Sequence, residues 1–115
     1  MIYQGGCHCG RIAFDVEGDI ESVIECNCSI CTKRGSLLWA VSRDKLQLTT
    51  DESDLATYTF HTGKIKHRFC PNCGCAPFAE GTDKSGERAA MVNVRCLEGV
   101  DVSALPVVAF DGRSY

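Results

Sequence analysis

The sequence has no long apolar run and no excess of positive charge, and each absence excludes a class of protein. No apolar stretch approaches the roughly 18 residues that a transmembrane helix requires. Lys and Arg number 12 against 15 Asp and Glu, so the net charge is −3 and the basic surface of a nucleic-acid-binding protein is missing. We therefore expect neither a membrane span nor a nucleic-acid partner, and the sequence does not indicate an oligomeric state.

The first residues also lack the pattern of an export signal. A basic start followed by an apolar stretch is absent, because the chain reaches Gly5, Gly6 and Cys7 almost at once. The expected location is therefore cytoplasmic, where cysteines serve metal or thiol chemistry more often than disulfides. The chain has nine cysteines among 115 residues, an odd number grouped at short spacings, which favours metal binding.

Helix signals and the familiar catalytic motifs are scarce as well. The sequence contains no glycine-rich phosphate loop and no readable Ser-His-Asp constellation. Helical turns are predicted only after Ser29, whose hydroxyl could cap one, and over 102–105, where Pro106 ends the other. Strand patterns dominate, and we expect strands at 11–17, 22–26, 36–41, 46–49, 55–60, 66–69, 76–79, 89–94 and 107–110.

Strict alternation over 11–17 places Ile12, Phe14 and Val16 on one face, as in a half-buried strand. Phe14 and Trp39 are therefore predicted to lie in the core. The length suits one domain, because a second would leave each half too small to form its own core. We expect a single all-β domain of short strands over residues 1–115.

The segment Cys70-Pro71-Asn72-Cys73-Gly74 has the form of a zinc knuckle. Two thiolates of such a turn bind one metal, backbone N–H groups point at the sulfurs, and Gly74 can adopt the left-handed conformation that lets the chain leave. A tetrahedral site needs two more ligands, and Cys7 and Cys9 can supply them. The alternative is a redox dithiol, but no helical pattern follows Cys73 as a thioredoxin-like motif would require.

The segment from Cys26 through Cys28 to Cys31 places three thiols within six residues, without a fourth cysteine nearby. Structural zinc sites have four protein ligands, whereas catalytic sites leave one position open. This spacing therefore predicts an open site, in which soft thiolate ligands favour a sulfur substrate. A distant residue could still close the site, the candidates being Cys75, Cys96, His8, His61 and His67. An iron–sulfur or rubredoxin-like carrier would use the same thiolates.

Three cysteine motifs in this order, Cys7-His8-Cys9, Cys26-x-Cys28-x-x-Cys31 and Cys70-x-x-Cys73, resemble the glutathione-dependent formaldehyde-activating enzyme family, which also includes centromere protein V. The resemblance extends to the strand around Asn93 and to the closing Phe110-Asp111-Gly112. It implies a small zinc-containing β-tent fold of short antiparallel strands. It also implies two zinc ions per chain: a structural zinc on Cys7, Cys9, Cys70 and Cys73, and a catalytic zinc on Cys26, Cys28 and Cys31.

The reaction implied by the resemblance joins glutathione to formaldehyde, which is carbon–sulfur lyase chemistry. The expected partners are a small thiol such as glutathione and a small aldehyde. Lys33 and Arg34, just beyond Cys31, could attract the carboxylates of glutathione. Two alternatives stay open: a non-catalytic zinc module that binds glutathione or another thiol, and a protein-interaction domain.

Overall fold

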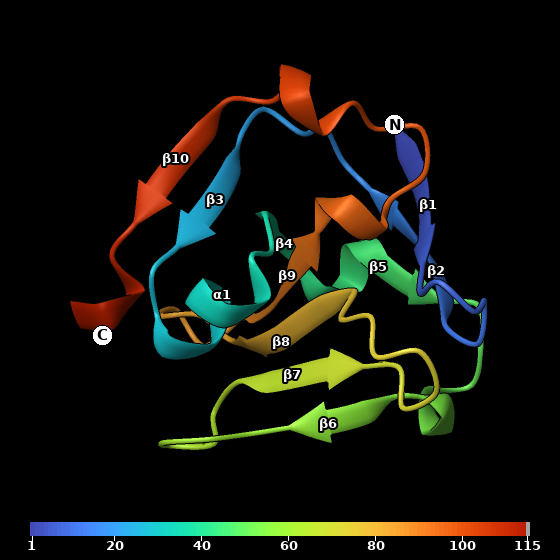
Figure 1. Ribbon diagram of the computed structural model, residues 1–115, viewed down its shortest axis with the longest axis horizontal. Coiled ribbons are helices and arrows are strands. Elements are labelled where there is room, and N and C mark those ends of the chain that lie inside the picture. Colours follow the sequence, from blue (N-terminus) through green and yellow to red (C-terminus); the bar gives the residue numbers. More distant parts are fainter. Residues whose placement is uncertain (115) are drawn as a thin grey trace.

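A computed structural model describes residues 1–114, which form two β-sheets and one short helix (Figure 1). The smaller sheet has the strand order β1 (Ile2–Gly6), β2 (Ala13–Glu17) and β5 (Leu46–Leu48). The larger sheet has the order β10 (Val107–Phe110), β3 (Val23–Cys26), β4 (Leu38–Ser42), β9 (Arg88–Asn93), β8 (Phe78–Thr82), β7 (Lys66–Phe69) and β6 (Ala56–Tyr58). Short 3₁₀ turns occupy Arg43–Lys45, Glu52–Asp54, Val94–Cys96, Val102–Ala104 and Gly112–Ser114. The predicted all-β fold of short strands is confirmed, and the described strands pair antiparallel as predicted, except β10 with β3.

The helix α1 (Ser29–Arg34) lies between β3 and β4 and differs from its prediction in one respect. Cys28 occupies its N-cap and makes no side-chain capping bond, so the prediction that the Ser29 hydroxyl caps it was wrong. At its other end Gly35 has φ +67°, the left-handed conformation that commonly ends helices. Within residues 1–114, no helix combines the length and the apolar character needed to cross a membrane.

The core lies between the two sheets. Phe14 and Val16 of β2 are 1% and 0% exposed, as the alternation predicts. The Phe14 ring meets that of Phe78 on β8 edge to face, with centroids 5.8 Å apart, so the two sheets pack directly on each other. Trp39 is also buried, as predicted.

Strand β1 is absent from the predicted strands, because its residues show no sustained alternation. It pairs antiparallel with the whole of β2. Gly5 lies against the Phe14 ring, and a Cβ at Gly5 would stand 2.6 Å from Cζ of Phe14. The glycine that weakens the strand pattern is therefore what allows Phe14 to pack beneath β1.

Strand β10 is the exception to the antiparallel pairing among the described strands. The predicted helical turn before it is a 3₁₀ turn, Val102–Ala104. After that turn, β10 runs parallel to β3 with Phe110 opposite Cys26. Parallel neighbours leave a sheet at the same end, so the segments that follow Cys26 and Phe110 lie side by side, with α1 beyond the end of β3 (Figure 1).

A charged cluster is buried on the larger sheet. The carboxylate of Glu80, a residue only 7% exposed, lies 3.3 Å from Arg43, 3.6 Å from Arg88 and 4.0 Å from Arg68. Arg68 is itself 6% exposed, so its guanidinium depends on protein partners for charge compensation.

We expect Glu80→Ala to lower the free energy of unfolding by about 3–5 kcal/mol, because the buried Arg68 would lose a countercharge. Urea denaturation followed by circular dichroism measures the change. Glu87→Ala removes the same charge from an exposed position and should alter stability by no more than about 0.5 kcal/mol. Equal losses in the two variants would contradict this account of Glu80.

Candidate metal centres

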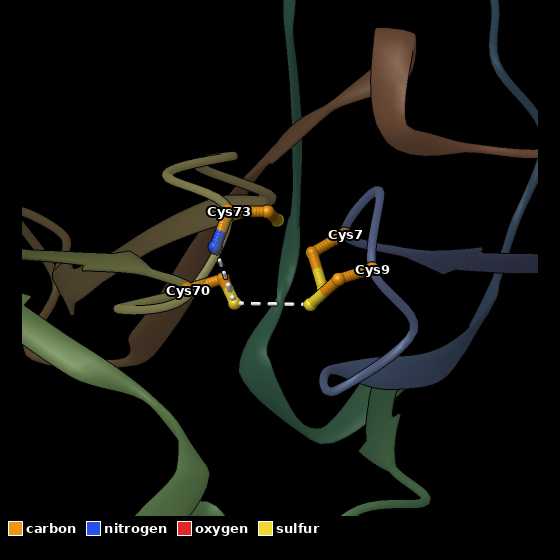
Figure 2. Close-up of side chains that lie close together, drawn as sticks. All are labelled: Cys7, Cys9, Cys70 and Cys73. Carbon is orange, nitrogen blue, oxygen red and sulfur yellow. Dashed lines mark hydrogen bonds between the residues drawn. The ribbon is translucent and has the colours of Figure 1, made fainter.

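Four cysteines from distant parts of the chain meet between the two sheets, and we call them the four-cysteine cluster: Cys7, Cys9, Cys70 and Cys73. Their sulfurs all lie within 4.8 Å of one another (Figure 2). The Sγ of Cys9 lies 3.6 Å from that of Cys7 and 3.6 Å from that of Cys70. A tetrahedral zinc with Zn–S bonds of about 2.3 Å separates its sulfurs by about 3.8 Å, so the spacing fits.

Two tight turns hold this cluster. Cys70 follows β7, and the N–H of Cys73 donates to its Sγ at 3.4 Å, as the knuckle predicts. Gly74 has the expected left-handed φ of +82°. The second turn joins β1 to β2, where the N–H of Ile12 donates to Cys7 Sγ at 3.3 Å. Hydrogen bonding to the Cys75 and Cys9 backbones lowers the pKa of the Cys73 thiol to about 5, which favours the thiolate that a metal binds.

A second group, the three-cysteine cluster, consists of Cys26, Cys28 and Cys31. Cys26 is the last residue of β3, Cys28 occupies the N-cap position of α1, and Cys31 lies in the first turn of that helix. Helical spacing places Cys28 and Cys31 on one face, and their sulfurs and that of Cys26 lie within 4.8 Å of one another. The N–H of Cys28 donates to Cys26 Sγ at 3.4 Å.

The donor set of the three-cysteine cluster calls for a cation. Burial, then the Cys28 hydrogen bond and the charges of Cys26 and Cys28, raise the pKa of Cys31 well above its usual range. Three thiolates this close repel one another unless a positive charge lies between them. A soft divalent ion such as Zn²⁺ supplies that charge and suits sulfur ligands. The cluster therefore fits a bound metal ion.

Neither cluster has a further potential ligand: no other His, Cys, Asp or Glu of residues 1–114 lies within 4.8 Å of all the sulfurs of either cluster. The five candidates for a fourth ligand, Cys75, Cys96, His8, His61 and His67, all stay outside the three-cysteine cluster. Cys75 follows the knuckle, where its C=O accepts from the N–H of Cys70 at 2.9 Å. His67 stacks on Phe60 with ring centroids 5.3 Å apart. Cys96 is partly buried.

A cavity of about 550 Å³ adjoins the three-cysteine cluster. Its walls come from the ends of β3 and β10, one face of α1 and the turn after β9. The lining residues are Glu25, Cys26, Asn27, Cys31, Thr32, Gly35, Ser36, Leu37, Arg95, Ala109, Phe110 and Asp111. The volume lies within the range of about 300–1,000 Å³ typical of small-molecule sites.

The sequence model of the glutathione-dependent formaldehyde-activating enzymes matches residues 2–109. The chain belongs to this family. The fold is also that of a protein from Rhodobacter sphaeroides, whose crystal structure was solved in a structural genomics programme. The two chains are 30% identical with a TM-score of 0.78, and the match covers 91% of this chain and 99% of the other.

In this family member, Lys33 and Arg34 lie across α1 from the cavity beside the three-cysteine cluster. They line a separate cavity of about 450 Å³ together with Ser29, Ile30, Tyr58, Phe60 and Phe69. The reason is helical geometry: residues 28, 31, 32 and 35 face one way, whereas 29, 30, 33 and 34 face the other. That Lys33 and Arg34 contact a thiol substrate stays a prediction.

Arg95 is the cation that the sequence analysis did not single out. It is the middle residue of the 3₁₀ turn Val94–Cys96, and it lines the cavity together with Cys26 and Cys31. Among the described residues its guanidinium has no carboxylate partner within 4.0 Å. No local pattern marks such a residue, because its place at the cavity depends on the pairing of β9 with β4.

Proposed function

We propose that the protein is a zinc-dependent carbon–sulfur lyase that joins glutathione or a similar thiol to a small aldehyde, as an S-(hydroxymethyl)glutathione synthase does. The proposal treats residues 1–115 as one catalytic zinc domain. The observation that carries it is a cluster of three sulfurs, without a fourth ligand among residues 1–114, beside a cavity of about 550 Å³. Family membership supports the choice of glutathione and formaldehyde as the reactants.

The two clusters take different roles in this proposal. The four-cysteine cluster holds a structural zinc that ties the β1–β2 turn to the knuckle after β7. Cys26, Cys28 and Cys31 hold the second, catalytic zinc. When bound there, zinc would lower the pKa of a thiol that reaches its vacant position, so that the thiol reacts as a thiolate at neutral pH.

The chain's own residues would bind and orient the substrate. Arg95 can receive a carboxylate of a thiol whose sulfur lies at the cluster, because both line the same cavity. Addition forms one bond between sulfur and the aldehyde carbon, and the C=O double bond becomes a C–O single bond. The proton lost by the thiol ends on that oxygen, directly or through solvent, so the reaction needs no redox partner.

Titration calorimetry with glutathione, set beside the rate of S-hydroxymethylglutathione formation, tests the proposal. We expect the zinc-loaded protein to bind glutathione and to raise the rate above the spontaneous reaction of the same reactants. Binding without a rate increase would refute the lyase and leave the thiol-binding module. Absence of both would leave the protein-interaction domain.

We expect Arg95→Met to raise the KM for glutathione about 10–100-fold, because a charge-assisted hydrogen bond contributes about 1.5–3 kcal/mol. The KM for cysteamine, a thiol without a carboxylate, should stay unchanged. Steady-state kinetics with both thiols measures the effect. Lys33→Met and Arg34→Met are the matched variants, and a glutathione-specific effect in these instead of in Arg95→Met would assign carboxylate recognition to the other face of α1.

A further inference from the structure

We propose that the C-terminal segment from Phe110 to Ser114 is a positioning element of the three-cysteine cluster, acting through Asn27 and Gly112. This inference rests on the metal-binding part of the proposed function, but not on its reaction. The segment begins at the last residue of β10 and reaches the cluster because β10 runs parallel to β3 (Figure 1). Figure 1 shows both strands ending beside the loop that leads into α1.

Asn27, which lies between Cys26 and Cys28, is bound to this segment by three hydrogen bonds. Its N–H donates to the Phe110 carbonyl at 3.2 Å. Its side-chain Nδ2 donates to Asp111 Oδ1 at 2.9 Å, and its Oδ1 accepts from the Arg113 N–H at 3.0 Å. Asn27 and the C-terminal segment are thus joined although more than eighty residues separate them in the sequence.

The remaining polar group of Asn27 is also used. Its carbonyl accepts from the hydroxyl of Thr32 on α1 at 3.0 Å. Every hydrogen-bonding group of Asn27 therefore has a protein partner, although the residue is exposed and water could satisfy it instead. These four hydrogen bonds fix the backbone of Asn27 between the two proposed metal ligands Cys26 and Cys28.

Asp111 is held in turn by its own segment. The Ser114 hydroxyl donates to Asp111 Oδ2 at 2.6 Å, so each carboxylate oxygen has a partner. Hydrogen bonds from Ser114 and Asn27 keep the pKa of Asp111 below its usual range, and the group stays ionised. The segment thus presents a fixed anionic acceptor to the Asn27 amide.

Gly112 makes the closest approach to the cluster. A Cβ at Gly112 would stand 2.4 Å from Cys26 Sγ and 3.2 Å from the Cβ of Cys28, so only glycine fits without displacing the loop. Gly112 thereby covers one side of the Cys26 sulfur, while Phe110 and Asp111 form a wall of the adjoining cavity. The segment leaves the cluster open toward the cavity, where a substrate would enter.

A charge exchange tests the Asn27 contact. In Asn27→Asp a second carboxylate would face that of Asp111, and we expect zinc affinity at the three-cysteine cluster to fall about 10–100-fold, as for other residues that orient metal ligands. An added negative charge would by itself strengthen cation binding, so a loss reports lost positioning. The double variant with Asp111→Asn restores one carboxylate and one amide, and should recover most of the affinity.

A steric change tests the Gly112 contact separately. Gly112→Ala should weaken zinc at the three-cysteine cluster to a similar extent and alter the thiolate-to-metal absorption of the cobalt-substituted protein. Gly81→Ala is the matched control, because Gly81 lies on β8, outside the cluster. A Cβ there would stand 3.4 Å from the nearest atom, which is an ordinary contact distance. Competition with a chromophoric chelator measures the affinity, and retention of metal by the four-cysteine cluster verifies the fold.

Parent-like zinc affinity and cobalt spectra in both Asn27→Asp and Gly112→Ala would overturn the inference. A loss in Asn27→Asp that the double variant does not recover would also overturn it. These readouts involve no turnover. A protein without lyase activity whose second metal still responds as expected would refute the proposed function and leave this inference standing.

Discussion

Cys9→Ala is expected to remove most of the protein's conformational stability. Cys9 is exposed, so alanine there costs little packing, and the effect reports the loss of the proposed structural metal. Structural zinc contributes on the order of 10 kcal/mol in small domains, comparable to the whole stability of a domain of this size. Loss of one of four thiolates should therefore lower the free energy of unfolding by about 4 kcal/mol or more.

The physical reason lies in what the four-cysteine cluster joins. Cys7 and Cys9 belong to the turn between β1 and β2, whereas Cys70 and Cys73 belong to the knuckle after β7 (Figure 2). A metal on these sulfurs links the smaller sheet to the larger one. Without that link, contact between the sheets depends on apolar packing such as that of Phe14 on Phe78.

Thermal unfolding and native mass spectrometry of Cys9→Ala measure this effect. Cys75→Ala is the matched control, because it removes a partly buried thiol that belongs to neither cluster. It should keep both metal ions and a melting temperature close to that of the parent. A Cys9→Ala protein that melts with the parent, despite having lost one metal ion, would contradict a structural role for this cluster.

The sequence could predict both clusters because their key spacings are local. A knuckle such as Cys70 to Cys73 places two sulfurs by its own turn geometry, and the count of four ligands then calls for a second pair. Cys26, Cys28 and Cys31 are likewise brought together by one loop and the first turn of α1. The structure groups the cysteines as the spacing predicts.

The surroundings of the open cluster could not be predicted in this way. Arg95 and Asp111 reach the cavity from the end of β9 and from beyond β10, and their positions depend on the order of seven strands. Nothing in the residues of β3 (VIEC) or β10 (VVAF) indicates that the two strands run parallel. Lys33 and Arg34 are near Cys31 in sequence, yet helical geometry turns them toward another cavity.

Cys31→Ala is expected to abolish the proposed lyase activity while sparing the fold. Two sulfurs would remain in the cluster, which is too few to hold the proposed second zinc ion. Lewis-acid activation contributes several kcal/mol to reactions of this kind, so kcat/KM should fall about 10³-fold or more. No residue of α1 is fully buried, so the packing lost with the Cys31 side chain should cost no more than about 1 kcal/mol.

The measurement pairs metal content with turnover. Cys31→Ala should retain one metal ion per chain, held by the four-cysteine cluster, and melt close to the parent, whereas Cys9→Ala should melt far below it. Activity with one metal ion fewer would show that the second metal is not catalytic. Two retained metal ions would show that another side chain replaces Cys31, and the double variant with Cys75→Ala would then identify Cys75 or exclude it. Since the two clusters share no residue, opposite effects of these two substitutions on stability and turnover would separate a structural metal from a catalytic one in the same chain.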